Sequence, residues 1–325
     1  MKLCYNRKKR DVLDISLFCC SRKLPVLMNS SLEAALDQFI ERERLPIAYR
    51  QTVELWFLPL AQTLLHHVAS SHRTLVVGIS GSQGSGKSTL ASLLVRLLKE
   101  MMGLRAINLS IDDFYHSFGY RQQLSREVHP LLATRGVPGT HDVELLHATL
   151  DALASAGQVK VPRFDKGMDD RRPEGEWTQV LGPLDVVIVE GWCLCIPPQP
   201  EASLDQPVNA LESEEDRDGR WRRFVNEQLK HHYAALWQRI DFLVLLKAPR
   251  FEMVYQWRQN QEDKLAAAVA AGKSAGSRVM SREQLRRFIQ HYERLTRHGL
   301  DVLPAVADVV FELTDSQTIA GKSKG

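Results

Sequence analysis

The chain has 325 residues, of which 44% are hydrophobic and 25% are charged, so it has the composition of a globular protein rather than of a collagen-like, coiled-coil or disordered chain. The length suits one elaborated domain, and no uninterrupted apolar run approaches the about 18 residues of a membrane-spanning helix. The formal net charge of +3 is too small to indicate nucleic-acid binding, so we expect neither a membrane nor a nucleic acid as a partner.

The first 27 residues carry the excess positive charge. They hold seven basic and two acidic residues, so the rest of the chain sums to a net charge of −2. Asp11 and Asp14 interrupt the apolar part of this segment and no small-residue cleavage pattern follows, which argues against a secretory signal. We predict that residues 1–27 form a disordered extension and that Met28 is an alternative start.

Five cysteines are present, three of them in residues 1–27 and the others at Cys193 and Cys195. This is not the pattern of a disulfide framework, and the Cys-x-Cys pair lacks the partner ligands of a zinc site. We therefore expect a reducing, cytoplasmic environment and no metal bound by cysteine.

Two helices are predicted before the first strand. Apolar residues recur at helical spacing over residues 32–40, and a second helix is expected at about residues 47–67. Neither helix carries a chemical motif. We interpret residues 28–72 as an N-terminal helical extension that packs on the core.

Residues 74–79 form a continuous apolar run, as expected for a strand buried on both faces of a parallel sheet. The run leads into Gly-Ser-Gln-Gly-Ser-Gly-Lys-Ser at residues 81–88 and then into a helical pattern, which is the order of a phosphate-binding P-loop. Backbone N–H groups of such a loop hold the phosphates, Lys87 reaches the terminal phosphates and Ser88 binds Mg²⁺. The residues expected to bind nucleotide are Gly81, Ser82, Gln83, Gly84, Ser85, Gly86, Lys87, Ser88 and Thr89.

The P-loop predicts ATP and Mg²⁺ as cofactors, but it does not define the reaction. The chain lacks the Asn-Lys-x-Asp motif of guanine-binding proteins and the Leu-Ser-Gly-Gly signature of ABC ATPases. A GTPase and a transporter ATPase are therefore disfavoured, and a small-molecule kinase fits the remaining features.

A second strand is predicted at residues 106–111, and it is followed by Asp112 and Asp113. Ligands of open α/β sheets bind beyond the carboxyl ends of the strands, so this pair is expected to face the P-loop. A carboxylate beside an acceptor hydroxyl orients it and accepts its proton. We predict this catalytic role for Asp112 and a substrate contact for Asp113. The alternative is that one of the two only caps the following turn.

Charged residues gather in two places before the next strand. Asp142 is predicted to cap a helix, and Arg135 and His141 flank its start, where they either contact an anionic substrate or lie on the surface. Residues 162–172 crowd four basic with three acidic side chains, which is typical of an exposed salt-bridged loop. The same loop also offers donors for a carboxylate and acceptors for hydroxyls. Our candidates for substrate binding there are Arg163, Asp165 and Arg171.

A third buried strand, at residues 184–190, ends in Glu190. An acid at this place in a core needs a partner, and the acid of a Walker B element has one in the metal ion. We predict that Glu190 holds Mg²⁺ opposite Ser88.

These motifs resemble those of a known family. The string Ser-Ile-Asp-Asp-Phe-Tyr at residues 110–115 is similar to the phosphoribulokinase, uridine kinase and pantothenate kinase group, in which the first Asp of the motif is the base. From residue 75 onward the closer resemblance is to ATP-dependent D-glycerate 3-kinase and its bacterial and fungal relatives. It is carried by Arg-Gly-Val-Pro-Gly-Thr-His-Asp at residues 135–142, Pro-Arg-Phe-Asp-Lys-Gly at 162–167, Val-Glu-Gly-Trp at 189–192, Asn-x-Leu-Glu at 209–212, Asp-Gly-x-Trp-Arg at 218–222 and Trp-Arg-x-x-Gln-Glu at 257–262.

The resemblance implies a lid after the strand at residues 241–247, in which an arginine closes over the phosphates and excludes water. We assign this role to Arg258 rather than Arg250, and the alternative is that Arg258 is a surface charge paired with Glu262. The resemblance also implies that the acidic stretch 204–219, by composition a solvated linker, is an ordered insertion near the acceptor.

A capping box of Ser281 and Gln284 opens the last predicted helix, a strand at residues 307–313 is expected to close the sheet, and residues 319–325 are expected to be a polar tail. The fold predicted is therefore α/β, a mostly parallel sheet flanked by helices. It forms a P-loop kinase domain at residues 73–318, with an N-terminal helical extension and a helical lid around residues 249–275.

From these features we expect ATP-dependent phosphorylation of a hydroxyl on a small anionic metabolite, which by resemblance is D-glycerate at its 3-hydroxyl. In this interpretation Lys87 and Mg²⁺ neutralise the phosphates, Asp112 deprotonates the acceptor and Arg258 closes the site. The expected partner is a small-molecule substrate, and the sequence predicts no particular oligomeric state.

Two alternatives stay open. One is a kinase for another acceptor, a nucleoside or pantothenate, because Phe114, Tyr115 and Phe164 would provide a platform on which a base stacks. The other is a regulatory ATPase, and the acceptor-side Asp112 argues against it because a switch has no use for such a base.

Overall fold

The structure is a computed structural model that describes residues 30–270 and 280–324. The predicted extension at residues 1–27 and residues 271–275 of the predicted lid lie outside the described residues. The chain divides into two compact units, Met1–Arg50 and Gln51–Gly325. The described part of the first unit contains helix α2 (Ser30–Arg42), whose Asp37 side chain pairs with the guanidinium of Arg50.

The helix predicted at about residues 47–67 is present as a continuous helical run at residues 49–70. It comprises α3 (Tyr49–Thr52), a π-helical turn (Val53–Phe57) and α4 (Leu58–Ser70). Pro59 has no N–H to donate, and the Leu58 N–H just before it reaches back five residues to the Val53 carbonyl. The proline thus explains why the regular hydrogen-bond ladder is interrupted at this point.

The second unit is built around a six-stranded sheet with the order β10-β9-β8-β1-β7-β2. All neighbouring pairs are parallel except β9 and β10. The parallel strands are β1 (Leu75–Gly81), β2 (Ala106–Ser110), β7 (Val186–Gly191), β8 (Phe242–Lys247) and β9 (Val309–Leu313). This confirms the predicted fold class.

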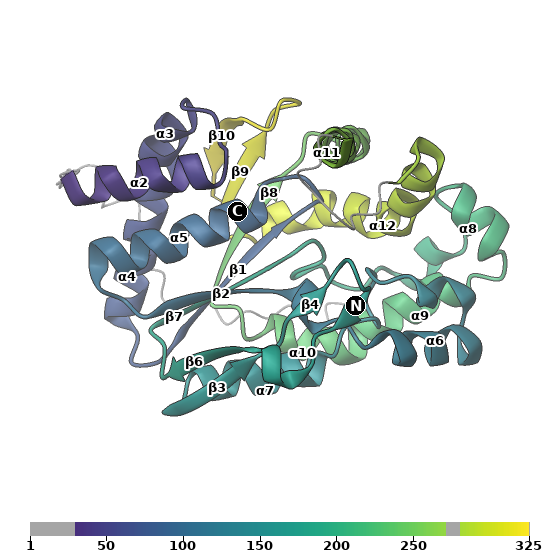
Figure 1. Cartoon of the computed structure of the whole chain (residues 1–325). Coiled ribbons are helices and arrows are strands. Elements are labelled where there is room, and N and C mark those ends of the chain that lie inside the picture. Colours follow the sequence, from purple (N-terminus) through teal and green to yellow (C-terminus); the bar gives the residue numbers. More distant parts are fainter. Residues whose placement is uncertain (1–29, 271–279, 325) are drawn as a thin grey trace. The chain divides into compact units, whose positions relative to one another are not determined.

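Helices cover both faces of the sheet (Figure 1). On one face α5 (Lys87–Met102) packs on β1, β2 and β7, and Trp56 and Phe57 contact Phe311 of β9 edge to face. On the other face the strands share one hydrophobic core with residues from several helices. Among these helices are α7 (Val143–Leu153), α9 (Arg220–Gln228), α10 (Ala234–Trp237) and α12 (Arg282–Val302). Burial on both faces explains the continuous apolar runs of β1, β7 and β8.

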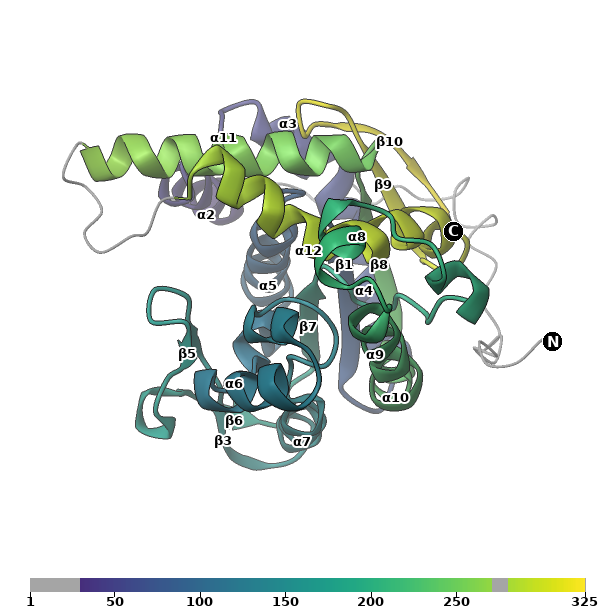
Figure 2. The same cartoon turned by 90° about the vertical axis from the view of Figure 1, so that its right-hand side faces the viewer.

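An inserted ribbon follows α7 and precedes β7. In it β3 (Gly157–Val161) pairs antiparallel with β6 (Thr178–Gly182), and between them in sequence lies the hairpin of β4 (Phe164–Asp165) and β5 (Asp170–Arg171). The remaining helices are α6 (Phe118–Glu127), α8 (Ala210–Glu215) and α11 (Phe251–Ala270). In Figure 2, α5 is seen between α11 and the inserted ribbon.

The prediction of a polar tail from residue 319 is wrong. Residues Ile319–Ser323 form β10, an antiparallel edge strand on β9, so β9 does not close the sheet. The turn between the two strands is closed by hydrogen bonds between Thr314 and Thr318. β10 is short and largely exposed, so its sequence lacks the apolar pattern by which a strand is recognised.

The acidic stretch 204–219 is an ordered insertion, not a solvated linker. Asn209 caps α8, as Asp142 caps α7 and Ser281 caps α12. The Glu212 carboxylate in this stretch is fully buried and pairs with Arg294 at 2.6 Å. A buried charge that is paired and hydrogen-bonded holds its segment in place, and composition alone does not reveal such a pair.

Candidate active site

The carboxyl ends of β1, β7 and β2 meet at one edge of the sheet. β7 lies between the other two strands, and its Glu190 is in register with Ile79 of β1 and with Ser110 of β2. The P-loop follows β1 directly, and Asp112 follows Ser110 by two residues. The strand order therefore brings the P-loop, Glu190 and Asp112 to the same edge of the sheet, where ligands of open α/β sheets bind.

The P-loop has the backbone that an anion site requires. Gly84 adopts a φ of 79°, which favours glycine, and a Cβ there would lie 2.8 Å from the Trp257 Cβ. Both the backbone conformation and the close contact therefore require glycine at this position. The helix α5 begins at Lys87 and is 16 residues long, so its N-terminus presents free N–H groups and a positive dipole end. The buried hydroxyls of Ser82 and Ser85 have no partner among the described residues, which leaves them available to a ligand.

Lys87 and Ser88 extend from the start of α5 toward two acids. Lys87 donates to the Ser82 carbonyl at 2.9 Å, and burial lowers the pKa of Lys87 while the charges of Glu190 and Asp112 oppose that shift. The Ser88 hydroxyl donates to Oε1 of Glu190 at 2.9 Å, and Glu190 is only 5% exposed. A hydroxyl and a carboxylate beside a phosphate site are the hard oxygen ligands that Mg²⁺ prefers, so these residues fit the metal.

Asp112 lies in the turn Ile111–Phe114, where the Ser110 hydroxyl accepts its N–H. Its carboxylate pairs with the ammonium of Lys166 at 2.7 Å. Burial raises the pKa of Asp112, but the charge and hydrogen bond of Lys166 outweigh burial and hold it below the usual value, with Lys87 acting in the same direction. The carboxylate is therefore ionised at neutral pH, as a general base must be.

Lys166 is a site residue that the sequence did not single out. It lies in the turn between β4 and β5, and its side chain is 63% exposed. The signal was the crowding of charges at residues 162–172, but the pattern does not show which of the four cations there reaches the base.

The other charged candidates near the hairpin have partners in the protein. Arg163 donates to Asp113 at 2.8 Å, and Asp113 also accepts the Phe164 N–H. Arg171 donates to the Tyr115 carbonyl at 2.9 Å and to the Asp142 carboxylate at 3.2 Å. These contacts fix β4 and β5 against the turn that carries Asp112.

Arg135 and Asp165 also take part in local structure. Arg135 pairs with Asp169 and lies 5.6 Å from the centre of the Phe164 ring. Asp165 accepts the N–H groups of Gly167 and Met168, and these backbone hydrogen bonds lower its pKa. The predicted substrate residues thus lie together around the hairpin, and their charged groups form ion pairs and hydrogen bonds that stabilise it.

His141 is buried beside the base. Its ring stacks on Tyr115 with the centroids 4.4 Å apart, and its Nδ1 lies 2.7 Å from the hydroxyl of Tyr233. Burial raises the pKa of Tyr115 well above its usual value, and the neighbouring Asp112 carboxylate adds to this shift. Tyr233 comes from the turn before α10, 92 residues away from His141, and no sequence pattern indicates this pair.

The helix α11 and the turn between β9 and β10 both lie at the P-loop, where a Cβ on Gly84 would approach the Trp257 Cβ to 2.8 Å. The Trp257 indole donates to the Asp315 carbonyl at 2.8 Å, and Gln317, in the turn between β9 and β10, donates to the Gly84 carbonyl at 2.6 Å. Arg258 pairs with Glu262 at 2.6 Å, which is the alternative partner expected from their spacing. Arg258 must exchange this partner for a phosphate if it acts as a lid arginine.

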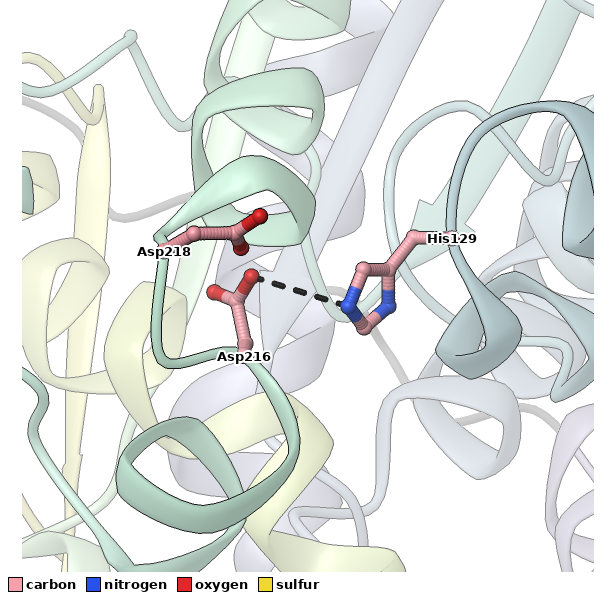
Figure 3. A group of neighbouring side chains, drawn as sticks. All are labelled: His129, Asp216 and Asp218. Carbon is pink, nitrogen blue, oxygen red and sulfur yellow. Dashed lines mark ion pairs between the residues drawn. The ribbon is translucent and has the colours of Figure 1, made fainter.

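A second cluster of titratable residues lies outside this site (Figure 3). His129 faces the carboxylate of Asp216, with Asp218 beside it, and one ligand atom from each lies within 4.8 Å of the others. Asp216, however, already accepts the N–H groups of Trp221 and Arg222 and pairs with the Arg222 guanidinium at 2.9 Å. Its charge is balanced by the protein, so we interpret the cluster as the structural start of α9 and not as a metal site.

Among the described residues, none of the helices is both long and apolar enough to cross a membrane. The family model described as Phosphoribulokinase / Uridine kinase family matches residues 76–195. An uncharacterized kinase of Schizosaccharomyces pombe is 34% identical over 235 residues, which are 68% of this chain and 79% of that protein. The chloroplastic D-glycerate 3-kinase of Arabidopsis thaliana is 33% identical over 229 residues, which cover 67% of this chain but only 46% of that protein.

A solved structure is also similar over most of its length. The D-glycerate 3-kinase of Cryptococcus neoformans is 28% identical, with a TM-score of 0.69, and the similarity covers 82% of this chain and 98% of that one. The matches in sequence and in structure extend well beyond the P-loop, across the strands that carry Asp112 and Glu190. The chain therefore belongs to the phosphoribulokinase/uridine kinase family of P-loop kinases.

Proposed function

We propose that this kinase transfers the γ-phosphoryl group of ATP to a hydroxyl of a small anionic metabolite, D-glycerate, to give 3-phosphoglycerate. The observation that carries the proposal is the ion pair of Asp112 with Lys166, at 2.7 Å, on the same sheet edge as the P-loop. It provides a base and a cation next to one another, which is what a hydroxy acid needs.

The exposure of the two partners supports an anionic acceptor. The Asp112 side chain is 28% exposed and that of Lys166 is 63% exposed, so the cation lies toward solvent from the base. An acceptor that places its hydroxyl at Asp112 therefore meets Lys166 with its outer end, and a carboxylate there gains a charge-assisted hydrogen bond. The similarity to two D-glycerate 3-kinases points to the same substrate class.

In the proposed reaction the acceptor oxygen forms a bond to the γ-phosphorus as the bond to the bridging oxygen breaks and ADP leaves. Asp112 takes the proton of the hydroxyl, and the P-loop N–H groups and Lys87 hold the phosphate charges in place. Arg258, once released from Glu262, supplies charge to the transferring group. When bound, Mg²⁺ neutralises charge on the phosphates, and the residues that would hold it are Ser88 and Glu190.

The aromatic residues near the base do not favour a nucleoside as acceptor. Phe114, Tyr115 and Phe164 are 0%, 3% and 8% exposed. Tyr115 already stacks on His141, and Phe164 contacts Tyr115 edge to face at 5.3 Å. None of the three offers a free ring face on which a base stacks.

A coupled assay of ADP release with a panel of acceptors tests the proposal. D-glycerate, uridine and pantothenate are added separately at saturating ATP and Mg²⁺, and the product is identified by mass spectrometry. We expect stimulation by D-glycerate alone. Stimulation by uridine or pantothenate but not by glycerate would refute the substrate assignment, and release that no acceptor changes would refute the acceptor-kinase assignment.

A further inference from the structure

The tautomer of His141 can be read from its hydrogen bonds. The Tyr233 oxygen lies 3.1 Å from the Gly139 backbone nitrogen and 2.7 Å from Nδ1 of His141. Gly139 has only an N–H to offer, so it donates, and the tyrosine oxygen accepts. The hydrogen of the Tyr233 hydroxyl is then assigned to Nδ1, because no other acceptor for it is found among the described residues. The ring proton of a neutral His141 therefore lies on Nε2.

The ring is neutral under ordinary conditions. His141 is 3% exposed, and burial lowers its pKa to about 3, even though the nearby charge of Asp112 raises it. The stacked Tyr115 and the hydroxyl of Tyr233 hold the ring in place from two sides. The result is a fixed, uncharged N–H donor.

This donor has no partner among the described residues. Nε2 of His141 is buried and forms no hydrogen bond to any of them. A buried N–H without a partner is unfavourable, and such groups in native proteins usually have a function. Tyr115 stacks on the imidazole of His141 and hydrogen-bonds to the carboxylate of Asp112, and the charge of Asp112 also acts on the His141 ring, so the ring lies in the neighbourhood of the proposed base.

Resting on the proposed function, we propose that Nε2–H of His141 donates a hydrogen bond to a second hydroxyl of the acceptor, on the carbon next to the one that is phosphorylated. Tyr233 is the positioning residue that keeps the proton on Nε2. The acceptor class is therefore a hydroxy acid with two neighbouring hydroxyls rather than a simple hydroxy acid.

A neutral donor beside a carboxylate suits a hydroxyl better than it suits a charged group. An acceptor carboxylate at His141 would lie close to the ionised Asp112, in a buried place where like charges repel strongly. Lys166 is more exposed and carries the compensating charge, so it is the better partner for the carboxylate. The two hydroxyls then occupy the inner part of the site and the carboxylate the outer part.

Discrimination between two acceptors tests this assignment. D-glycerate and 3-hydroxypropionate differ only in the middle hydroxyl, so their ratio of kcat/KM isolates its contact. We expect His141→Leu to lower kcat/KM for D-glycerate about 10- to 100-fold, the usual effect of losing one buried hydrogen bond, and to leave 3-hydroxypropionate within a few-fold. His141→Gln retains a donor near the Nε2 position and should restore part of the preference for D-glycerate over 3-hydroxypropionate in kcat/KM. His147→Gln is the matched control, because His147 is on α7, where its ring lies against the guanidinium of Arg239 outside the site.

A second measurement does not depend on turnover. In protein labelled with ¹⁵N-histidine, the ring nitrogens of His141 report the tautomer directly, and the His141→Gln spectrum assigns the signals. We expect the Nε2–H form in the wild type, a shift of the Nε2 signal when D-glycerate binds with a non-hydrolysable ATP analogue, and loss of the single tautomer in Tyr233→Phe. Tyr120→Phe, an exposed tyrosine on α6, is the control.

The outcomes separate the two proposals. If D-glycerate is phosphorylated but His141→Leu leaves the ratio unchanged, or if the proton lies on Nδ1, the role of His141 is wrong and the proposed function stands. If D-glycerate neither binds nor is phosphorylated, both are wrong. A His141→Leu protein that does not fold still leaves the tautomer, the binding shift and the wild-type ratio as tests.

Discussion

The Lys166 ammonium lies 2.7 Å from the Asp112 carboxylate, although 54 residues separate the two in the chain. The pair joins the tip of a hairpin in the inserted ribbon to the end of β2, so the position of the hairpin decides whether the proposed base keeps its charge partner. Lys166 lowers the pKa of Asp112, and in the proposed function its exposed ammonium also binds the carboxylate of the acceptor. The two effects can be measured separately.

Replacing Lys166 with Met should change both the KM for the acceptor and the pH dependence of kcat/KM. The loss of a charge-assisted hydrogen bond raises KM for the acceptor about 10- to 100-fold. Lys166 holds the pKa of Asp112 below its usual value, so without it that pKa rises and the acidic limb of the pH profile of kcat/KM moves to higher pH. Lys160→Met is the control, because Lys160 pairs with Glu174 on the exposed face of β3. An unmoved acidic limb would show that Lys166 does not act on the base.

Replacing Asp112 with Asn should abolish most of the turnover. An amide cannot accept the proton, so kcat should fall by about 10²- to 10⁴-fold. The Kd of ATP, measured by calorimetry, should stay close to that of the wild type because the proposed role of Asp112 is toward the acceptor. Asp151→Asn, an exposed acid paired with Arg239, is the control. Near-normal turnover in Asp112→Asn would mean that another group is the base.

Arg258 and Arg250 make a matched pair of variants. If Arg258 leaves Glu262 to reach the phosphates, Arg258→Ala lowers kcat about 10- to 1000-fold and changes the Kd of ATP little, since the contact forms as the phosphoryl group is transferred. Arg250 pairs with Asp315 at the surface, and both side chains are more than half exposed, so Arg250→Ala should be nearly silent. A silent Arg258→Ala together with a strong Arg250→Ala would reverse the assignment.

The buried pair of Arg222 and Asp216 offers a test of stability. Both side chains are almost fully buried, so Arg222→Met leaves an uncompensated carboxylate and should cost about 3–5 kcal/mol of the free energy of unfolding. The neighbouring Arg223→Met removes an exposed pair with Asp205 and an exposed hydrogen bond to the Asp218 carbonyl, and should cost about 0–1 kcal/mol. Urea unfolding of the two proteins gives both values. Equal losses would argue against a structural role of the cluster in Figure 3.

Gln317 tests the contact of the last hairpin with the P-loop. Gln317→Ala removes the hydrogen bond to the Gly84 carbonyl, so the loop is held less firmly and KM for ATP should rise several-fold, by about as much as a net hydrogen bond contributes. KM for the acceptor should not change. Gln123→Ala, which loses only an exposed contact with Glu127 on α6, is the control. A change in the KM of the acceptor alone would contradict this interpretation.

The parts of the site that follow strands were predictable from the sequence. The P-loop, Asp112 and Glu190 each come directly after a buried apolar run, and the carboxyl ends of parallel strands meet at one edge of the sheet. The helix caps Asp142 and Ser281 were also predictable, because capping depends only on a few neighbouring residues of the sequence.

The parts that depend on distant contacts were not predictable. Lys166 was one of four cations in a short segment, and only the fold shows that it reaches Asp112 while Arg163 and Arg171 bind elsewhere. Tyr233 reaches His141 from the π-helical turn before α10, 92 residues along the chain. The five mostly exposed residues of β10 carry no apolar pattern, so the sequence predicts a tail there, and the pairing of β10 with β9 is a property of the sheet rather than of the segment.

The hydrogen bond from Gln317 to Gly84 spans 233 residues of sequence. At about 5–20 residues per second the ribosome needs about 10 to 50 s to travel that distance, and throughout this time the P-loop already exists without its partner. The P-loop, the first motif in the chain, thus gains this hydrogen bond only when the turn between β9 and β10 has been made. A truncated product that carries every recognisable kinase motif still lacks this contact, so an apparently intact nucleotide-binding sequence is not yet a finished nucleotide site.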